Sequence, residues 1–199
     1  MLDVTGSERV KSEATPPTKF TYEDFRNFPD DGKRHEIIDG EHYVTPSPDT
    51  KHQRVARNLT LALGSYLERY PAGEVFAAPF DVVLSALDVV EPDLLYISRE
   101  RWQILTDKHV RGAPDLAVEI LSPGTRKTDE VEKRLLYERF GVHEYWLVDP
   151  ELDTINVYRR VGEAFVRVAE LSVEHGDVLA TPLLPDWSVP LAKIFAPPI

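Results

Sequence analysis

Apolar residues recur along the chain with two kinds of spacing, and these spacings predict its secondary structure. Spacings of three and four residues predict helices, whereas alternating or continuous apolar runs predict strands. The expected helices are a short one at 21–25, where Thr21 and Asp24 form a loose capping-box pattern, and longer ones at about 49–70 and 125–140. The expected strands are a hairpin at 35–44 that turns at Asp39-Gly40, followed by 75–85, 89–97, 114–121, 144–149, 154–159, 165–171 and 178–181.

The order of these elements predicts an α/β fold. The strands at 75–85, 89–97 and 114–121 can form a meander, with a polar linker at 99–111 that holds a short helix. The helix at 125–140 is expected to cross over and return strand 144–149 parallel to its neighbour. Strand 154–159 then pairs with 144–149, and 165–171 and 178–181 form a final hairpin or meander. The expected architecture is an α/β sandwich, with a mixed central β-sheet flanked by helices.

Length and composition indicate one globular domain. The chain has 199 residues, of which 42% are hydrophobic and 29% charged, enough for a full hydrophobic core. Residues 1–18 are rich in Ser, Thr, Glu and Pro and are expected to be disordered, with 19–199 as the single domain. The polar N-terminus lacks the apolar region of a secretory signal, and no apolar run is long enough for a membrane span. We therefore expect a cytoplasmic protein.

Cysteine content and net charge narrow the chemistry. Because the chain has no cysteine, a bound metal must use oxygen or imidazole ligands, which favours Mg²⁺, Mn²⁺ or Ca²⁺. The net charge of −11 argues against strong non-specific binding to nucleic acid, which depends on Lys and Arg contacts to phosphates. An acidic chain can still bind DNA through a local basic patch or through metal ions.

Two carboxylates lie in segments that otherwise resemble buried strands. Asp93 is in the run 89–97, and Glu119 is in the run 114–121. Unpaired buried carboxylates are costly, so such residues are kept with a partner, typically a metal ion or a basic group. If the two strands are neighbours, Asp93 and Glu119 converge on one face, where a divalent ion fits between them, with the carbonyl of Ile120 and waters as further ligands. The structural alternative places the acids at strand ends, exposed or capping a loop.

Four other residues accompany these acids. Lys133, on the helix at 125–140, can point at the sheet and polarise an attacking water or stabilise a developing phosphorane charge, with Asp129 one turn before to orient it. The alternative for Lys133 is a solvated surface lysine. Glu36, in the hairpin, could add a carboxylate to the metal site. His52 lies in the first turn of the long helix, facing inward, where a lone histidine is more often a core residue than a ligand.

Several stretches of the chain also resemble a known family. The likeness is carried by His35–Glu41, Pro48 with His52, Glu91–Leu94, Pro114–Pro123, Lys133, Tyr137, Gly141-Val142 and Glu144–Pro150. Over roughly residues 20 to 190, the chain resembles the Uma-type putative restriction endonuclease family of the PD-(D/E)XK (restriction-endonuclease-like) nuclease superfamily.

This resemblance implies a restriction-endonuclease-like fold and Mg²⁺- or Mn²⁺-dependent cleavage of DNA. Pro92-Asp93 would be the PD element and Glu119 the second acid, so that Asp93 and Glu119 hold the metal. The chain departs from the superfamily pattern at Leu121, two positions after Glu119, where a lysine is expected. The resemblance implies that this lysine has moved to the following helix as Lys133, which completes the catalytic set. By the same analogy the partner is DNA and the protein is a homodimer, so that both strands can be cut.

The sequence alone leaves three functions open. The first is a Mg²⁺-dependent endonuclease acting on DNA. The second is a catalytically inactive protein of the nuclease fold that acts in nucleic-acid or protein interaction, which the acidic charge and Leu121 favour. The third is a glycosidase that uses paired carboxylates as acid and base and tryptophans as sugar platforms, and it leaves Lys133 without a role.

Overall fold

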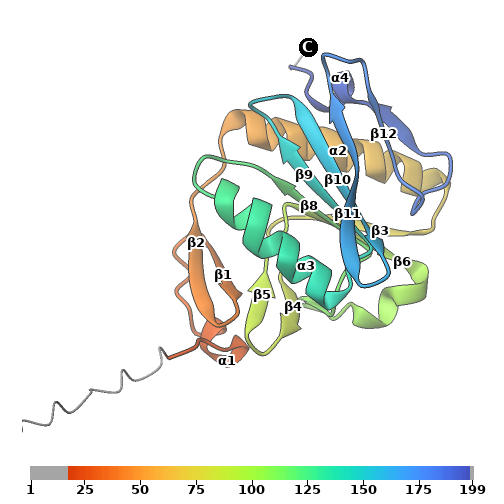
Figure 1. Cartoon of the computed structure of the whole chain (residues 1–199). Coiled ribbons are helices and arrows are strands. Elements are labelled where there is room, and N and C mark those ends of the chain that lie inside the picture. The colour runs from red at the N-terminus through yellow and green to blue at the C-terminus, as the bar shows by residue number, and fades with distance from the viewer. Residues whose placement is uncertain (1–17, 198–199) are drawn as a thin grey trace, which may run out of the picture.

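The structure is a computed structural model that describes residues 18–197 of the chain. Figure 1 shows a large sheet with helices on both of its sides and a smaller sheet next to it. Of the segment 1–18 that we expected to be disordered, all but residue 18 lies outside the described residues. No helix within 18–197 combines the length and the apolar character that crossing a membrane requires.

A six-stranded mixed sheet forms the centre of the fold. Its strands, in spatial order, are β11 (Ala164–Ser172), β10 (Thr154–Val161), β9 (Glu144–Asp149), β8 (Leu116–Ile120), β6 (Leu94–Ser98) and β3 (Gly73–Ala77). β8 and β9 are parallel, and the other neighbours are antiparallel. The parallel return of β9 beside β8 and the pairing of β9 with β10 are therefore confirmed, and β3, β6 and β8 keep the antiparallel order of the predicted meander.

A second sheet of five strands was not predicted. Its order is β2 (Glu41–Thr45), β1 (Arg34–Ile38), β5 (Asp88–Val90), β4 (Val82–Ser85) and β7 (Val110–Arg111). The hairpin expected at 35–44 is β1 and β2, but the long strands expected at 75–85 and 89–97 are wrong, because each is divided between the two sheets. Pro79 and Pro92 lie in the gaps, and a proline has no N–H to donate to a continuous ladder.

The C-terminal strands also pair differently from the prediction. β11 forms its hairpin with β10, while β12 (Val178–Ala180) pairs with β13 (Ser188–Pro190) in a separate two-stranded sheet. The predicted hairpin or meander of 165–171 with 178–181 is therefore wrong. The apolar pattern marked β11 and β12, but it missed β13, the partner of β12, because its three residues carry too short a pattern.

Side chains cap the N-termini of α1 and α2, and a glycine ends α3. They are α1 (Tyr22–Phe25), α2 (Thr50–Arg69), a 3₁₀ helix (Arg99–Ile104), a π-helical segment (Thr128–Lys133) that continues into α3 (Arg134–Phe140), and α4 (Leu191–Ile194). Thr21 and Asp24 form the expected capping box of α1. Asp49 accepts a hydrogen bond from the His52 N–H at the start of α2, and Gly141, with a φ of 81°, ends α3.

The two faces of the six-stranded sheet are covered by different elements. Val55, Leu59 and Leu63 of α2 pack in one apolar cluster with Leu94 and Val118. Leu136 and Tyr137 of α3 pack in a second cluster with Leu95 and Ala117, together with residues of the five-stranded sheet. Figure 1 accordingly shows α2 and α3 on opposite sides of the sheet. Since residues alternate between the faces of a strand, Glu119 shares the α3 side with Ala117.

Candidate active site

The pairing of β6 with β8 brings Asp93 and Glu119 together. Leu94 pairs with Val118 in antiparallel register, so Asp93 and Glu119 take the next position on the two chains. The Ile120 N–H donates to Asp93 Oδ2 at 2.8 Å. Both carboxylates line one small cavity, and the two residues are only 5% and 1% exposed. This is the convergence expected if the two strands are neighbours.

Three donors hold the Asp93 carboxylate. Arg34 Nη1 donates to Oδ1 at 2.9 Å, and His52 Nε2 lies 3.1 Å from Oδ2, next to the Ile120 N–H. Burial alone would raise the pKa of Asp93, but His52, Arg34 and the Ile120 N–H together lower it below its ordinary value. Asp93 is therefore ionised, and His52 faces this carboxylate from the first turn of α2.

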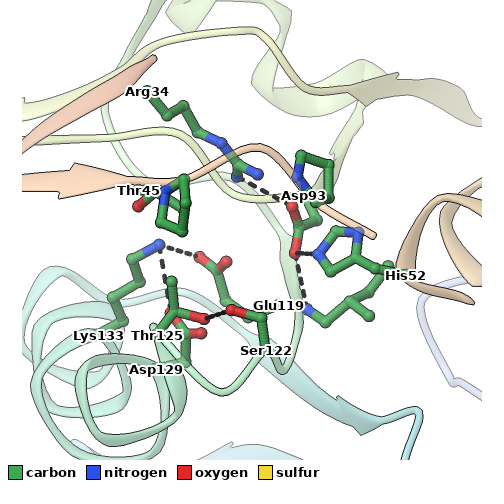
Figure 2. A pocket seen from close by; sticks show the side chains of 12 residues that line it. Arg34, Thr45, His52, Asp93, Glu119, Ser122, Thr125, Asp129 and Lys133 are labelled. Carbon is green, nitrogen blue, oxygen red and sulfur yellow. Dashed lines mark hydrogen bonds and ion pairs between the residues drawn. The ribbon is translucent and has the colours of Figure 1, made fainter. Parts of the chain in front are cut away.

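Lys133 is surrounded by carboxylates. Its Nζ lies 2.9 Å from Glu36 Oε1, 3.1 Å from Glu119 Oε1 and 3.4 Å from Asp129 Oδ1, as Figure 2 shows in part. Burial opposes the charged form of Lys133, but the nearby carboxylates outweigh it and raise the pKa of the ammonium group well above its ordinary value. Lys133 is 2% exposed, so it is not the solvated surface lysine of the alternative interpretation.

All six residues singled out in the sequence thus belong to one cluster, since Glu36 and Asp129 contact Lys133 and His52 contacts Asp93. Sequence reasoning missed two further members. Tyr137 donates its hydroxyl hydrogen to Glu119 Oε1 at 2.7 Å, and its position four residues after Lys133, on the same helix face, was a usable signal. Arg34 gave no such signal, because nothing in the hairpin sequence separates it from a solvated arginine.

Buried carboxylates outnumber the permanent cations around this cavity. The carboxylates are Glu36, Glu91, Asp93, Glu119 and Asp129, and the cations are Lys133 and Arg34. Burial raises the pKa of Glu119 and of Asp129, and neighbouring carboxylates add to both shifts. The cluster therefore stabilises added positive charge, whether as protons or as a cation.

The donors of this cluster fit a hard divalent cation. They are oxygen atoms, which Mg²⁺ and Mn²⁺ prefer. Asp129 Oδ1 is buried 3.4 Å from Lys133 Nζ without forming a hydrogen bond. Glu91, which lines the neighbouring cavity, has a buried Oε2 with no hydrogen bond to the described residues. Within 18–197, no three His, Cys, Asp or Glu side chains already surround a common point as a metal site. Mg²⁺ needs fewer, because it keeps several waters and is usually held by one or two carboxylates.

Glu91 provides a prediction about pH. Burial, with Asp81 nearby, raises the pKa of Glu91 from 4.5 to about 8. An acid whose pKa is higher in the folded chain binds its proton more tightly there, so the free energy of unfolding should fall between about pH 4.5 and pH 8 and then level off. We expect Glu91→Gln to remove part of this fall. After allowance for solvent screening, the free energy of unfolding of the variant should exceed that of the wild type by on the order of 1 kcal/mol at pH 9.

Thermal unfolding of both proteins at pH 6 and pH 9 measures this effect. For a chain of this size, 1 kcal/mol corresponds to about 2–4 °C in the unfolding temperature. Glu163→Gln, on an exposed residue, is the control and should show no comparable gain. The prediction would be contradicted if the difference in unfolding temperature between Glu91→Gln and the wild type were the same at pH 6 and at pH 9.

The central cavity is narrow. Its volume is about 10 Å³, close to that needed for one water molecule. Pro46 and Pro48, in the connection from β2 to α2, line it, and Pro46 packs near Gly124 of the connection that follows β8. Two larger cavities, of about 410 and 270 Å³, lie beside it and share Arg34 and Pro48 with it.

Comparisons with known proteins point to nucleases. A sequence model of the Uma2 family, described as "Putative restriction endonuclease", matches residues 22–192. The chain is similar to the crystal structure of a putative nuclease belonging to DUF820 from Anabaena variabilis, with 20% identity, a TM-score of 0.74, and coverage of 89% of this chain and 98% of that one. This likeness confirms the restriction-endonuclease-like α/β fold.

A weaker likeness links the chain to the type IIG restriction endonuclease BpuSI. The identity is 16% and the TM-score 0.39, with coverage of 72% of this chain and 15% of that one, which is too low to support an argument. No curated protein matches the chain.

Proposed function

The chain belongs to the Uma2 family of putative restriction endonucleases, and from this premise we propose that it is a Mg²⁺- or Mn²⁺-dependent endonuclease that hydrolyses phosphodiester bonds of DNA in the cytoplasm. One observation carries the proposal: Asp93 and Glu119 meet, buried, at one end of paired strands, with the ammonium group of Lys133 3.1 Å from Glu119. A merely structural set of acids would not need to converge on one cavity.

Each residue of the cluster has a role in this proposal. Asp93 and Glu119, with the Ile120 carbonyl, would hold the metal, which when bound polarises the phosphate and activates water. Lys133 is the electrostatic stabiliser of the transition state, because its raised pKa keeps it positively charged and so unable to act as a base. Glu36 and Asp129 fix its ammonium group, while His52 and Tyr137 orient Asp93 and Glu119.

Metal dependence tests the proposal directly. We expect the purified protein to nick supercoiled plasmid DNA with Mn²⁺ or Mg²⁺ and to lose this activity in EDTA, because the proposed mechanism needs the metal to polarise the phosphate and activate water. Gel analysis of relaxed and linear plasmid measures the rate, and re-addition of metal after EDTA should restore it. Activity that persists in EDTA would contradict the metal-dependent mechanism.

The second candidate function is a catalytically inactive nuclease fold that acts in nucleic-acid or protein interaction. The observation that favours it is the net charge of −11, since most DNA-binding domains are basic. Absence of nicking with every divalent metal would support it. The glycosidase interpretation has no support in the geometry, because no tryptophan is among the described residues that line the central cavity or its two neighbours.

We also propose that the active form is a homodimer. One chain supplies one set of Asp93, Glu119 and Lys133, and cutting both strands of a duplex requires two such sets acting together or in succession. Sedimentation velocity should therefore give a particle of twice 22.6 kDa. A monomer at the concentrations used in the cleavage assay would contradict this.

A further inference from the structure

Arg34 lies where the three cavities meet. It lines the central cavity and both of its neighbours, and its side chain is 15% exposed. Nη1 donates to Asp93 Oδ1 at 2.9 Å and to the Glu91 carbonyl at 3.0 Å. Nε is 3.9 Å from Glu91 Oε2, and neither Nε nor Nη2 makes a hydrogen bond to the residues in 18–197. A guanidinium group has five N–H donors, so most of those on Arg34 are free for a ligand in the cavities.

Arg34 competes with a cation for Asp93. Oδ2 of Asp93 already accepts from His52 and the Ile120 N–H, so Oδ1 is the oxygen left for a metal. Arg34 holds this same oxygen at 2.9 Å. A cation at Oδ1 would lie within a few ångströms of the guanidinium charge, and like charges repel strongly in a site of low dielectric. While Arg34 holds Asp93, it opposes metal binding.

We propose that Arg34 is the phosphate-binding residue of the substrate site, and that its transfer from Asp93 to a phosphodiester frees Asp93 for the divalent cation. This inference rests on the proposed nuclease function. Arginine forms paired hydrogen bonds to phosphate oxygens, and its unused Nε and Nη2 donors suit such a pair. The phosphodiester also brings the negative charge that the guanidinium group loses when it leaves Asp93.

The surroundings of Arg34 suit a strand of nucleic acid. The larger of the two neighbouring cavities, of about 410 Å³, is within the size range of ligand pockets, and the other has about 270 Å³. Besides Arg34, each has a basic residue on its wall, Lys33 or Arg57, and each also has carboxylates: Asp30 and Glu91 in the first and Asp93 in the second. Arg34 therefore lies between two spaces where the groups on either side of a phosphodiester could bind. The consequence is positive coupling: phosphate tightens metal binding, and metal tightens phosphate binding by the same factor.

Mn²⁺ binding to the full-length protein tests this coupling. The signal of free Mn²⁺ in electron paramagnetic resonance gives the affinity, with and without dimethyl phosphate, a phosphodiester probe that resists hydrolysis. We expect the wild type to bind Mn²⁺ about tenfold more tightly with the probe, within the usual range of coupling. Arg34→Met should bring this ratio close to one and should bind Mn²⁺ more tightly than the wild type when the probe is absent.

Two further variants keep the test decisive. Arg34→Lys preserves the charge without the paired donors and should lower the ratio even if Arg34→Met fails to fold. Arg69→Met, on the exposed end of α2, should keep the wild-type ratio. A ratio that is one in the wild type, or unchanged in both Arg34 variants, overturns the role of Arg34 and leaves the nuclease proposal standing. If the wild type binds no Mn²⁺ at all, neither with dimethyl phosphate nor without it, the role of Arg34 and the nuclease proposal are both overturned.

Discussion

Glu119→Gln is expected to lower the rate of DNA cleavage by about 10³-fold, because it removes one of the two charged metal ligands in the proposed site. The amide has the shape of the carboxylate, so its oxygen can still accept from Tyr137 and Lys133. Burial raises the pKa of Glu119, whereas Lys133 opposes this shift. Loss of the charge therefore removes both a desolvation cost and an attraction to Lys133, and we expect the variant to stay folded when no metal is present.

Initial rates of plasmid nicking and thermal unfolding in EDTA measure the two effects on the same preparations. Glu170→Gln, on the exposed edge strand β11, is the matched control and should cleave like the wild type. A Glu119→Gln protein that is folded and retains more than a tenth of the wild-type rate would show that Glu119 does not hold the metal. Loss of activity together with loss of folding would mean that Glu119 acts mainly in stability.

The convergence of Asp93 and Glu119 could be predicted because it depends on simple periodicity. Residues two apart on a strand face the same way, so each acid could be assigned to a face once its strand was recognised. The helix that carries Lys133 was recognisable from its apolar spacing, and that placed the ammonium group over the sheet. These relations need only the positions of polar residues in apolar runs.

Other features of the site depend on relations that no local pattern contains. The division of 75–85 and 89–97 between two sheets follows from where the chain turns near Pro79 and Pro92, and a proline in an apolar run is also compatible with an edge strand. This division places Arg34 of β1 next to Asp93, 59 residues away along the chain. The π-helical segment Thr128–Lys133 could not be predicted either, because the spacing of the apolar residues there also suits an α-helix.

Lys133→Met is expected to lower both activity and stability. The loss of the ammonium group removes stabilisation of the charge that develops in the transition state, a loss typically worth about 10²- to 10³-fold in rate. It also leaves Glu36, Glu119 and Asp129 without their shared cation. Removing one partner of a buried ionic cluster typically costs about 3–5 kcal/mol in the free energy of unfolding.

The dependence of this cost on pH separates Lys133 from an ordinary core residue. Burial raises the pKa of Glu119 and Asp129, so these carboxyls take up protons as the pH falls and no longer need the ammonium charge. Denaturant unfolding should therefore show a large difference between Lys133→Met and wild type at pH 8 and a smaller one near pH 5. Lys127→Met, on an exposed lysine at the start of the same helical region, should not change the free energy of unfolding at either pH.

The contrary outcome is a destabilisation of Lys133→Met that is the same at pH 5 and pH 8. It would mean that packing of the lysine stem, rather than its charge, holds the cluster together. The electrostatic role of Lys133 in cleavage would then lose its physical basis.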